Sequence, residues 1–461
     1  MKSKLLLPLS LAGLVAALFL FQANLVSSQV TSQAPGGGFT ASDPGVRADP
    51  PGSPPSAGGP IAGLVGNQGP LFVDGLAQFG EADEVADGLG PRMNLDSCAG
   101  CHAQPATGGT SPFVNPQVAF ASKDGGTDTV PSFVAANGPV REARFVSNPD
   151  KTADGGVHAL FTITGRADAG GCTLAQPDFA AQLGNNNVIF RIPTPVFGAG
   201  LIEQISDAAI VANVASSAAQ KQALGIKGKP NITGTTNNNG NDGTIARFGW
   251  KAQNKSLLLF SGEAYNVEQG ISNELFQTER DETVNCQFKP TPNDVTNNDP
   301  AATDPRSDVE RFAVFMRFLA PPTPSPDTPG GASSIAHGAA LFTSTGCALC
   351  HTPSFTTSPS TVAALSVQPV NLFSDLVVHD MGDGLADGVS QGAAGPREFR
   401  TAPLWGLGQR IFFLHDGRTA DLLRAIREHS SKKSEANGVI SRFNDLSETD
   451  KQDLLNFLRS L

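Results

Sequence analysis

The chain has 461 residues, with 32 lysines and arginines against 43 aspartates and glutamates, which gives a formal net charge of −11. This acidic balance argues against nucleic-acid binding. The length predicts two or three domains, and the abundance of glycine (50) and proline (34) favours a loop-rich protein over a regular sheet or bundle.

Residues 1–28 have the pattern of a secretory signal peptide. Two lysines precede a mostly apolar run from Leu5 to Phe21, and small residues precede the expected cleavage point after Ser28. We therefore expect an exported protein, in the periplasm or outside the cell. The alternative is an uncleaved membrane anchor, although the run is short for a membrane span. No later stretch of the sequence is apolar enough to cross a bilayer.

Composition also suggests where the domains begin and end. Residues 29–65 are rich in glycine, proline, serine and alanine, and such a segment cannot bury enough apolar surface to offset the entropy that it loses on ordering. We expect a flexible linker there, followed by an N-terminal domain over 66–322. A second stretch rich in proline, glycine and serine then precedes a C-terminal domain over 334–461.

Helical periodicity dominates the segments that can be assigned. Ser307–Leu319 is predicted to be a helix, because Ser307 and Glu310 have the spacing of a capping box and Pro321 ends the pattern. Apolar stripes with helical spacing also precede the first cysteine pair and end the chain, at Leu71, Phe72, Leu76 and Phe79 and at Leu454, Leu455, Leu458 and Leu461. These patterns predict a mainly α fold with a long irregular insertion from about 110 to 245.

Two Cys-x-x-Cys-His motifs stand at the centre of the two expected domains. This motif is typical of c-type haem attachment, in which both sulfurs form thioethers with the haem and the histidine binds the iron. The two motifs use four of six cysteines and two of seven histidines. We expect two covalent haems, and the alternative is a zinc or redox Cys-x-x-Cys. The sulfurs would come from Cys98, Cys101, Cys347 and Cys350, and the iron ligands from His102 and His351.

The two remaining cysteines are Cys172 and Cys286. An even remainder in an oxidising compartment predicts a disulfide. The alternative is two free buried thiols.

Further motifs resemble those of a known family. The segments Phe399-Arg-Thr-Ala-Pro-Leu-Trp405, Phe412-Phe-Leu-His415-Asp-Gly417 and Leu422 to Ile426 resemble the signature of bacterial diheme cytochrome c peroxidases. A closer resemblance is to the diheme oxidoreductase, putative peroxidase family, through Asn94-Leu-Asp-Ser-Cys98, Phe248-Gly-Trp-Lys-Ala-Gln253 and His379-Asp-Met-Gly382. The resemblance covers roughly residues 69–461. It implies two cytochrome c-like haem domains that carry long irregular insertions.

The sixth iron ligands decide between electron transfer and chemistry, because a haem that reacts with a small oxidant needs an open or releasable position. For the second haem, the resemblance places a ligand fourteen residues after His415, at His429. Independently, Leu422, Ile426 and His429 share one helical face. The alternatives are Met381 as the ligand and a surface role for His429. His415 is expected to hydrogen-bond near the haem rather than to bind the iron.

For the first haem, the next histidine after the motif is His158, far along the chain. It is a candidate ligand, but we favour an open or water-bound iron. The resemblance implies that Glu268 is the distal carboxylate that moves a proton during peroxide cleavage, with Glu263 as the alternative. Trp250 resembles the tryptophan that lies between the two haems of the family, although core packing would also explain it. Arg410 and Phe412 replace a calcium-binding segment of the relatives, so calcium is doubtful.

These features together predict an exported diheme c-type oxidoreductase of the peroxidase type. The C-terminal haem would transfer electrons and the N-terminal haem would activate a ligand. Its partners would be a small redox protein or another electron donor or acceptor, and a small-molecule oxidant. Two alternatives stay open. One is a non-catalytic electron-transfer cytochrome, and the other is a haem oxygenase of an organic substrate, for which the insertion could build a pocket.

Overall fold

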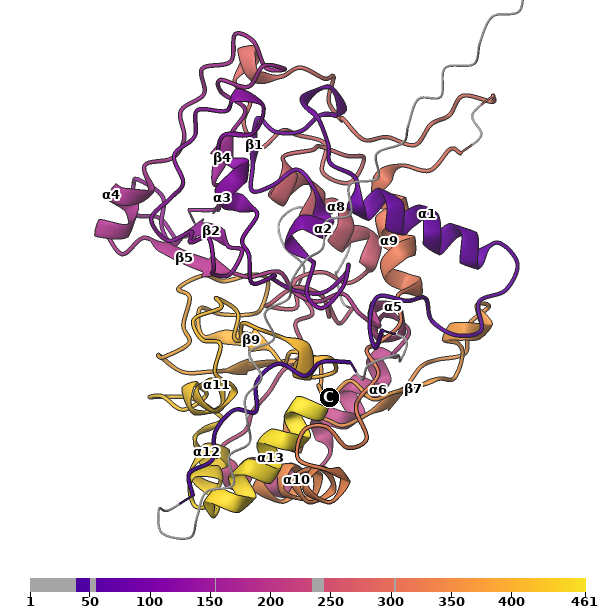
Figure 1. The fold of residues 1–461 in the computed structure, drawn as a ribbon, viewed down its shortest axis with the longest axis vertical. Helices are drawn as coiled ribbons and strands as arrows, with labels where there is room; N and C mark the ends of the chain where they lie inside the picture. The colour runs from indigo at the N-terminus through magenta and orange to yellow at the C-terminus, as the bar shows by residue number, and fades with distance from the viewer. Residues whose placement is uncertain (1–38, 50–54, 154, 234–243, 302–303) are drawn as a thin grey trace, which may run out of the picture. The chain divides into compact units, whose positions relative to one another are not determined.

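The computed structural model describes residues 39–49, 55–153, 155–233, 244–301 and 304–461 (Figure 1). The predicted signal peptide at 1–28 and the first part of the predicted linker lie outside these residues. The described chain is rich in helices and contains only small sheets, as a mainly α fold requires. None of its helices combines the length and apolar character needed to cross a bilayer.

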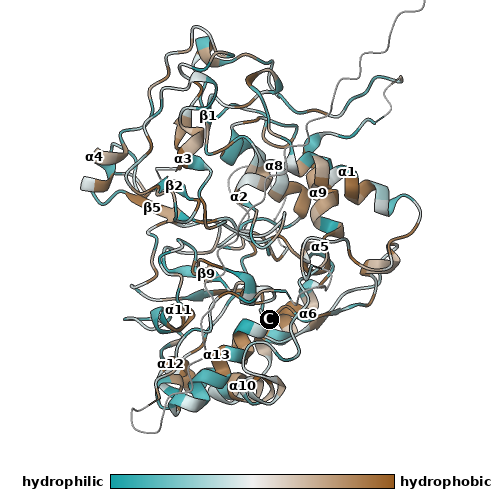
Figure 2. Ribbon diagram, viewed as in Figure 1, coloured by the Kyte–Doolittle hydropathy of each residue, from teal (hydrophilic) through white to brown (hydrophobic). Residues whose placement is uncertain are grey.

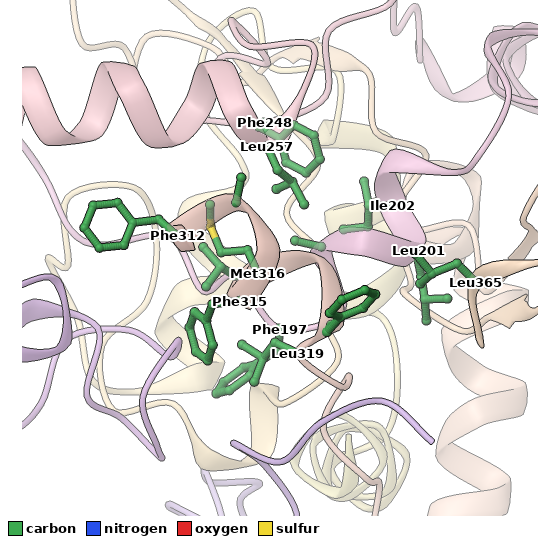
Figure 3. Packing of buried hydrophobic residues seen from close by; sticks show 14 of the residues in the cluster. Phe197, Leu201, Ile202, Phe248, Leu257, Phe312, Phe315, Met316, Leu319 and Leu365 are labelled. Carbon is green, nitrogen blue, oxygen red and sulfur yellow. The ribbon is translucent and has the colours of Figure 1, made fainter. Parts of the chain in front are cut away.

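Three helices from distant parts of the chain form the first core. They are α1 (Gln68–Gly80), α8 (Leu257–Gln269) and α9 (Asp308–Phe318), and α9 packs against both of the others. The predicted capping box begins α9, since Ser307 Oγ accepts from the Glu310 amide and Glu310 caps the Ser307 amide in return. Figure 3 shows Phe312, Phe315 and Met316 of α9 among the aromatic and aliphatic side chains of this core. The apolar residues that recur with helical spacing in the sequence therefore pack between these helices.

A second helical group surrounds the C-terminal motif. Helix α10 (Ala332–Thr345) and the terminal helix α13 (Glu448–Ser460) lie side by side in Figure 1. Gly338 permits this close packing, because a Cβ there would lie 2.0 Å from the Asp453 carbonyl oxygen. Figure 2 shows hydrophilic and hydrophobic stretches along the same helix in α13, which fits its predicted apolar stripe. Two shorter helices complete the group, α11 (Leu422–Glu428) and α12 (Asn437–Asn444).

The region expected to be an irregular insertion contains regular structure. Its helices are α3 (Gln117–Phe120), α4 (Phe179–Gly184), α5 (Ala199–Glu203), α6 (Asp207–Ala215) and α7 (Ala218–Leu224). An antiparallel sheet of order β3–β2–β5 is built from Val157–His158, Glu142–Phe145 and Val188–Arg191. Three two-stranded antiparallel pairs complete the fold: β1 (Arg92–Met93) with β4 (Phe161–Thr162), β6 (Phe355–Thr356) with β7 (Pro369–Val370), and β8 (Val378–Asp380) with β9 (Glu398–Arg400). These strands are too short to give a period in the sequence.

The described part of the predicted linker is anchored to the rest of the chain. Asp43 accepts from the Arg459 guanidinium at 2.6 and 2.7 Å and from the Leu422 amide at 2.7 Å. The Arg47 amide donates to the Gly408 carbonyl at 2.7 Å. Composition gave no sign of this order, because it comes from a few charged side chains set among glycine, proline and alanine. The segment therefore packs as a strap on the C-terminal helices.

The predicted disulfide between Cys172 and Cys286 is confirmed. Both residues are buried in a second hydrophobic core that also contains Phe120, Phe161 and Phe179. The bridge joins the insertion to the segment after α8, which are 114 residues apart in the sequence.

One buried ion cluster joins three distant segments. The Asp387 carboxylate accepts from the Arg191 guanidinium at 2.9 Å and from the Lys251 ammonium at 2.9 Å. The side chains of Asp387 and Lys251 are fully buried and that of Arg191 is 7% exposed. Burial alone would raise the pKa of Asp387, but the two cations hold it below its usual value. Both cations therefore depend on the single carboxylate of Asp387 for a counter-charge in direct contact.

Removing the disulfide is expected to destabilise the fold. In the chain-entropy model a bridge that closes so long a loop contributes about 4 to 5 kcal/mol. The double variant Cys172→Ser/Cys286→Ser should lose stability in urea unfolding, and wild-type protein unfolded under dithiothreitol should behave like it. Equal stability of the oxidised and variant proteins would contradict the bridge as a stabilising element.

Replacing Asp387 is expected to destabilise the fold by about 3 to 5 kcal/mol, because two buried cations would lose their counter-charge. Urea unfolding of Asp387→Asn measures the loss. Adding Lys251→Met to this variant should recover part of it by removing one cation. Asp150→Asn, at an exposed loop position, is the matched control and should change little. A loss no larger than that of the control would sink the interpretation.

Candidate functional site

Two cavities each have one Cys-x-x-Cys-His motif in their walls. The first measures about 1050 Å³, including its part open to solvent, and its lining includes Cys98, Cys101 and His102. The second measures about 1540 Å³ on the same basis, and its lining includes Cys347, Cys350 and His351. All four cysteines are free thiols. Each predicted motif therefore faces a hollow with two sulfurs and an imidazole on its wall.

His102 is held in the orientation of a metal ligand. It follows the short helix α2 (Cys98–Cys101), and its Nδ1 donates to the Gly109 carbonyl at 2.9 Å. Burial lowers the pKa of the imidazole to about 4, so the ring is neutral. With the proton on Nδ1, the Nε2 lone pair remains available, and it bonds to none of the described residues. A backbone carbonyl fixing the other nitrogen is the usual support of an imidazole that binds a metal.

The second cavity contains two imidazoles held in this way. His351 Nδ1 donates to the Phe373 carbonyl at 3.0 Å, and His429 Nδ1 donates to the Ala425 carbonyl at 2.8 Å. Burial, together with the neighbouring His429, lowers the pKa of His351 to about 4. The predicted helical face is confirmed, since α11 ends at Glu428 and His429 caps it. Met381, the alternative ligand, lines the same cavity.

The other predicted histidines have different surroundings. His415 lines the second cavity with its ring stacked on Phe399, at 4.2 Å between centroids and 23° between planes. Its ring nitrogens bond to no residue that the structure describes, so the expected hydrogen bond has no protein acceptor there. His158 lies in β3, but its side chain is outside the described residues.

Glu268 and Glu263 both lie on α8, but only Glu268 lines the first cavity. Burial, together with repulsion from Glu142 and Glu263, raises the pKa of Glu268 to about 8. Its carboxylate bonds to no residue that the structure describes. Glu263 instead accepts a hydrogen bond from the Asn254 amide. Gln253 and Gln269 also line this cavity.

Trp250 lies between the two cavities and lines both of them. Its indole Nε1 donates to the Ile192 carbonyl at 2.9 Å, and its own carbonyl accepts from the Arg400 amide at 2.8 Å. Ile192 and Pro193 also line both cavities. These residues form the partition between the two cavities, and at the indole only the Trp250 side chain separates them.

Sequence reasoning missed two buried cations in the second cavity. Arg400 and Arg410 are each 9% exposed and line this cavity, and neither has an ion-pair partner among the described residues. The pKa of each is lowered to about 10, by burial for Arg410 and by burial together with the charge of Arg410 for Arg400. Two buried guanidiniums of like charge are costly unless an anion joins them. In the sequence, Arg400 stood out only as part of the Phe399–Trp405 motif, and Arg410 only as a departure from the calcium-binding segment of the relatives.

The residues present fit a haem in each cavity. Paired thiols can take up the vinyl groups, a neutral imidazole with a free Nε2 can bind the iron, and the guanidiniums of the second cavity suit the two carboxylates of the macrocycle. By contrast, no group of three or more histidine, cysteine, aspartate or glutamate residues in the described chain could hold a bare metal ion.

A third hollow was also missed. It lies beside the second cavity and is lined by α7 and by Asp375, Val377 and His379. His379 bonds through Nε2 to Asp375 at 2.9 Å and through Nδ1 to Glu435 at 2.9 Å. Burial opposes charge on this ring, but Cys350 and Asp375 raise its pKa well above the usual value. Because both nitrogens are occupied, His379 is not positioned to bind iron.

Two comparisons with known proteins give no information about function. No curated protein matches the chain. A solved structure of Kuenenia stuttgartiensis hydrazine synthase under xenon pressure matches at 19% identity and a TM-score of 0.27, over 45% of this chain and 63% of that one. The chain spans less than two thirds of that structure, and at this TM-score the likeness carries no inference about function.

A family match covers most of the chain. Residues 146–461 match the family described as "Di-haem oxidoreductase, putative peroxidase", a range that includes Trp250, Glu268, the second motif and His429, while the first motif precedes it. The chain therefore belongs to the di-haem oxidoreductase, putative peroxidase family.

Proposed function

We propose that this protein is an exported di-haem oxidoreductase that reduces peroxide or a related small oxidant. Each Cys-x-x-Cys-His motif attaches one haem covalently. The second haem takes up electrons from a donor, and the small oxidant is bound and reduced in the first cavity. The observation that carries the proposal is the contrast between the cavities: the second has two imidazoles with free Nε2 atoms, and the first has one such imidazole beside an unpartnered carboxyl group.

Different coordination at the two irons follows from this contrast. A haem in each cavity would supply redox chemistry, which is the uptake of electrons and their transfer to a small oxidant. His351 and His429 would both hold the second haem through their Nε2 atoms, which suits electron transfer. His102 is the one histidine among the described lining residues of the first cavity, so a haem held there would keep a position for the oxidant.

Glu268 handles the proton that peroxide cleavage requires. As a carboxylate it would accept a proton from one oxygen of peroxide, and as a carboxylic acid it would return that proton to the other oxygen, which leaves as water when the O–O bond breaks. Two electrons from the donor and two further protons would convert the remaining oxygen into a second water. A pKa near 8 suits this exchange, because a group that titrates near the working pH can serve in both directions.

Trp250 relays electrons between the cavities, since its indole lines both of them. Export is supported by the buried disulfide, because such bridges persist in oxidising compartments. Two haem domains with limits at 66–322 and 334–461 also remain part of the proposal.

Low-temperature EPR of the oxidised protein, after intact mass has established two attached haems, tests the coordination. We expect one high-spin signal from the first iron and one low-spin signal from the second. His429→Ala should remove the low-spin signal, because it takes away one of the two axial nitrogens. Met381→Ala is the matched control and should leave that signal in place.

If Met381→Ala removed the low-spin signal and His429→Ala left it in place, the ligand would be Met381. Two low-spin signals that persist on half-reduction would contradict the proposal and leave an electron carrier. A high-spin signal without peroxide turnover, but with oxidation of an added organic compound, would favour the oxygenase.

The pH profile of peroxide reactivity tests Glu268. The carboxyl group must be ionised to accept a proton, so the second-order rate constant should rise with pH through about 8 and then level off. Glu268→Gln should abolish this rise and lower the rate constant by roughly 10²- to 10⁴-fold. Stopped-flow absorbance of the haems measures both effects.

Glu263→Gln is the control, because it changes a buried carboxyl group of the same helix that bonds to Asn254 and lies outside the cavity lining. Its profile should keep the rise through pH 8. A profile flattened by Glu263→Gln but not by Glu268→Gln would assign the proton exchange to Glu263.

A further inference from the structure

We propose that the third hollow, here called the α7 groove, docks a small acidic electron-transfer protein that exchanges electrons with the second haem. The groove has a volume of about 800 Å³ including its open part, and its lining runs over α7, the following turn and β8. This inference rests on the proposed function, because it requires an electron-accepting haem in the second cavity.

The groove reaches the haem attachment site of the second cavity. Asp375 and His379 line the groove, and His379 lines the second cavity as well. The Asp375 amide donates to the Cys350 carbonyl at 2.9 Å, and His379 Nδ1 lies 3.7 Å from Cys350 Sγ. One imidazole therefore separates the groove from the sulfur that the haem would carry. A partner seated there would lie close to the macrocycle edge.

Packing holds this imidazole firmly in place. A Cβ at Gly228 would lie 2.2 Å from His379 Cε1, so the groove wall touches the ring directly. Asp375 and Glu435 bond to its two nitrogens, and Glu435 also accepts from the Lys227 amide at 2.7 Å. The groove, the ring and the attachment cysteine form one rigid unit.

The rim of the groove has the charge sign opposite to that of the whole chain. Lys221 and Lys227 line it, whereas the neighbouring Lys229 is paired with Glu398 at 2.8 Å and adds little to its charge. No aspartate or glutamate occurs between residues 208 and 241, although the chain carries a net charge of −11. Lys221 is held at the end of α6 by the carbonyls of Asn213 and Val214, at 2.8 and 3.1 Å. An acidic partner would be steered to this basic rim and repelled by much of the remaining surface.

The lining between the lysines suits a transient protein contact. Val214 and Ala218 give the groove a small accessible apolar surface above the buried Ile226 and Val377, so the groove combines an apolar centre with a charged rim. Electron-transfer complexes use small interfaces of this kind, since they must also dissociate quickly.

The test uses one redox protein in two charge states. The probes are ferric mitochondrial cytochrome c, which is basic, and its succinylated form, which is acidic. The fully reduced protein is mixed with each in a stopped-flow instrument, and one electron passes from the second haem to each cytochrome c iron. At low ionic strength we expect the acidic form to react at least about tenfold faster, with the advantage lost at high salt. The net charge of −11 alone would give the reverse order.

Charge reversal locates the contact. Lys221→Glu/Lys227→Glu should remove the advantage of the acidic form, and Lys227→Glu alone should remove part of it. The single variant guards against misfolding, because the Lys221 side chain bonds to α6, whereas Lys227 contributes its backbone amide to a hydrogen bond. Lys151→Glu/Lys255→Glu makes the same charge change away from the groove lining and should leave the advantage intact.

A faster reaction of the basic form, or equal losses in the groove and control variants, would overturn the proposal. Failure of the proposed function is recognised separately, because haem attachment and reduction of the second haem are visible in the absorbance spectrum before mixing. Calorimetric titration with succinylated cytochrome c at low salt then measures docking without electron transfer. Binding that survives charge reversal at Lys221 and Lys227 would again count against the groove.

Discussion

The partition between the two cavities depends on one buried carboxylate. Asp387 forms buried ion pairs with Arg191 and Lys251. Each of these cations is next in sequence to a residue that separates the two cavities. Ile192 follows Arg191, and Trp250 precedes Lys251. The Ile192 amide donates to the His415 carbonyl at 2.8 Å and its carbonyl accepts from the indole. Fixing the two cations thus fixes the indole relative to both cavities. The Lys251 ammonium also lies over the Phe399 ring at 4.1 Å, and that ring stacks on His415. Lys251 therefore also stabilises the position of two aromatic rings that line the second cavity.

Acidic and basic groups line both cavities, Glu142, Glu268, Arg141 and Arg191 in the first and Glu435, Arg400 and Arg410 in the second, but the groups with a part in the proposed function differ. Glu268 stands in the first, next to Glu142, with its pKa raised by burial. Arg400 and Arg410 stand in the second without carboxylate partners in the described chain. On the proposed function this difference is physically consistent. A carboxyl group that titrates near neutral pH serves a site where protons accompany electrons, whereas fixed guanidiniums hold an anionic macrocycle in place and exchange no protons.

The sequence predicted the features that depend on local chemistry. Both motifs, the capping box of α9, the stripe of α13 and the helical face that ends at His429 follow from spacing alone. The cysteine remainder predicted the disulfide. What could not be predicted depends on contacts between distant segments. In the sequence Asp387 looks like an ordinary loop residue, because its partners Arg191 and Lys251 are far away along the chain. The strap over 40–49 is held by single charged residues such as Asp43. The strands of the insertion were missed because they are only two to four residues long, which is too short for an alternating pattern to stand out.

The insertion therefore serves both cavities, although composition suggested only loops. Its sheet supplies Glu142 and Arg191 to the lining of the first cavity. Its helices α6 and α7 instead reach the second motif, where Asn213 donates to Thr352 Oγ1 at 2.9 Å and Gly228 packs on His379. One continuous segment thus builds a wall of the proposed reaction site and the proposed entry for electrons. Between them stands Trp250, which the same segment fixes through Ile192. Electrons that enter at the α7 groove would pass His379, the second haem and the indole before they reach the first cavity. Because every step of that route is bordered by residues 142–228, the length of the insertion has a physical reason that does not require a large organic substrate.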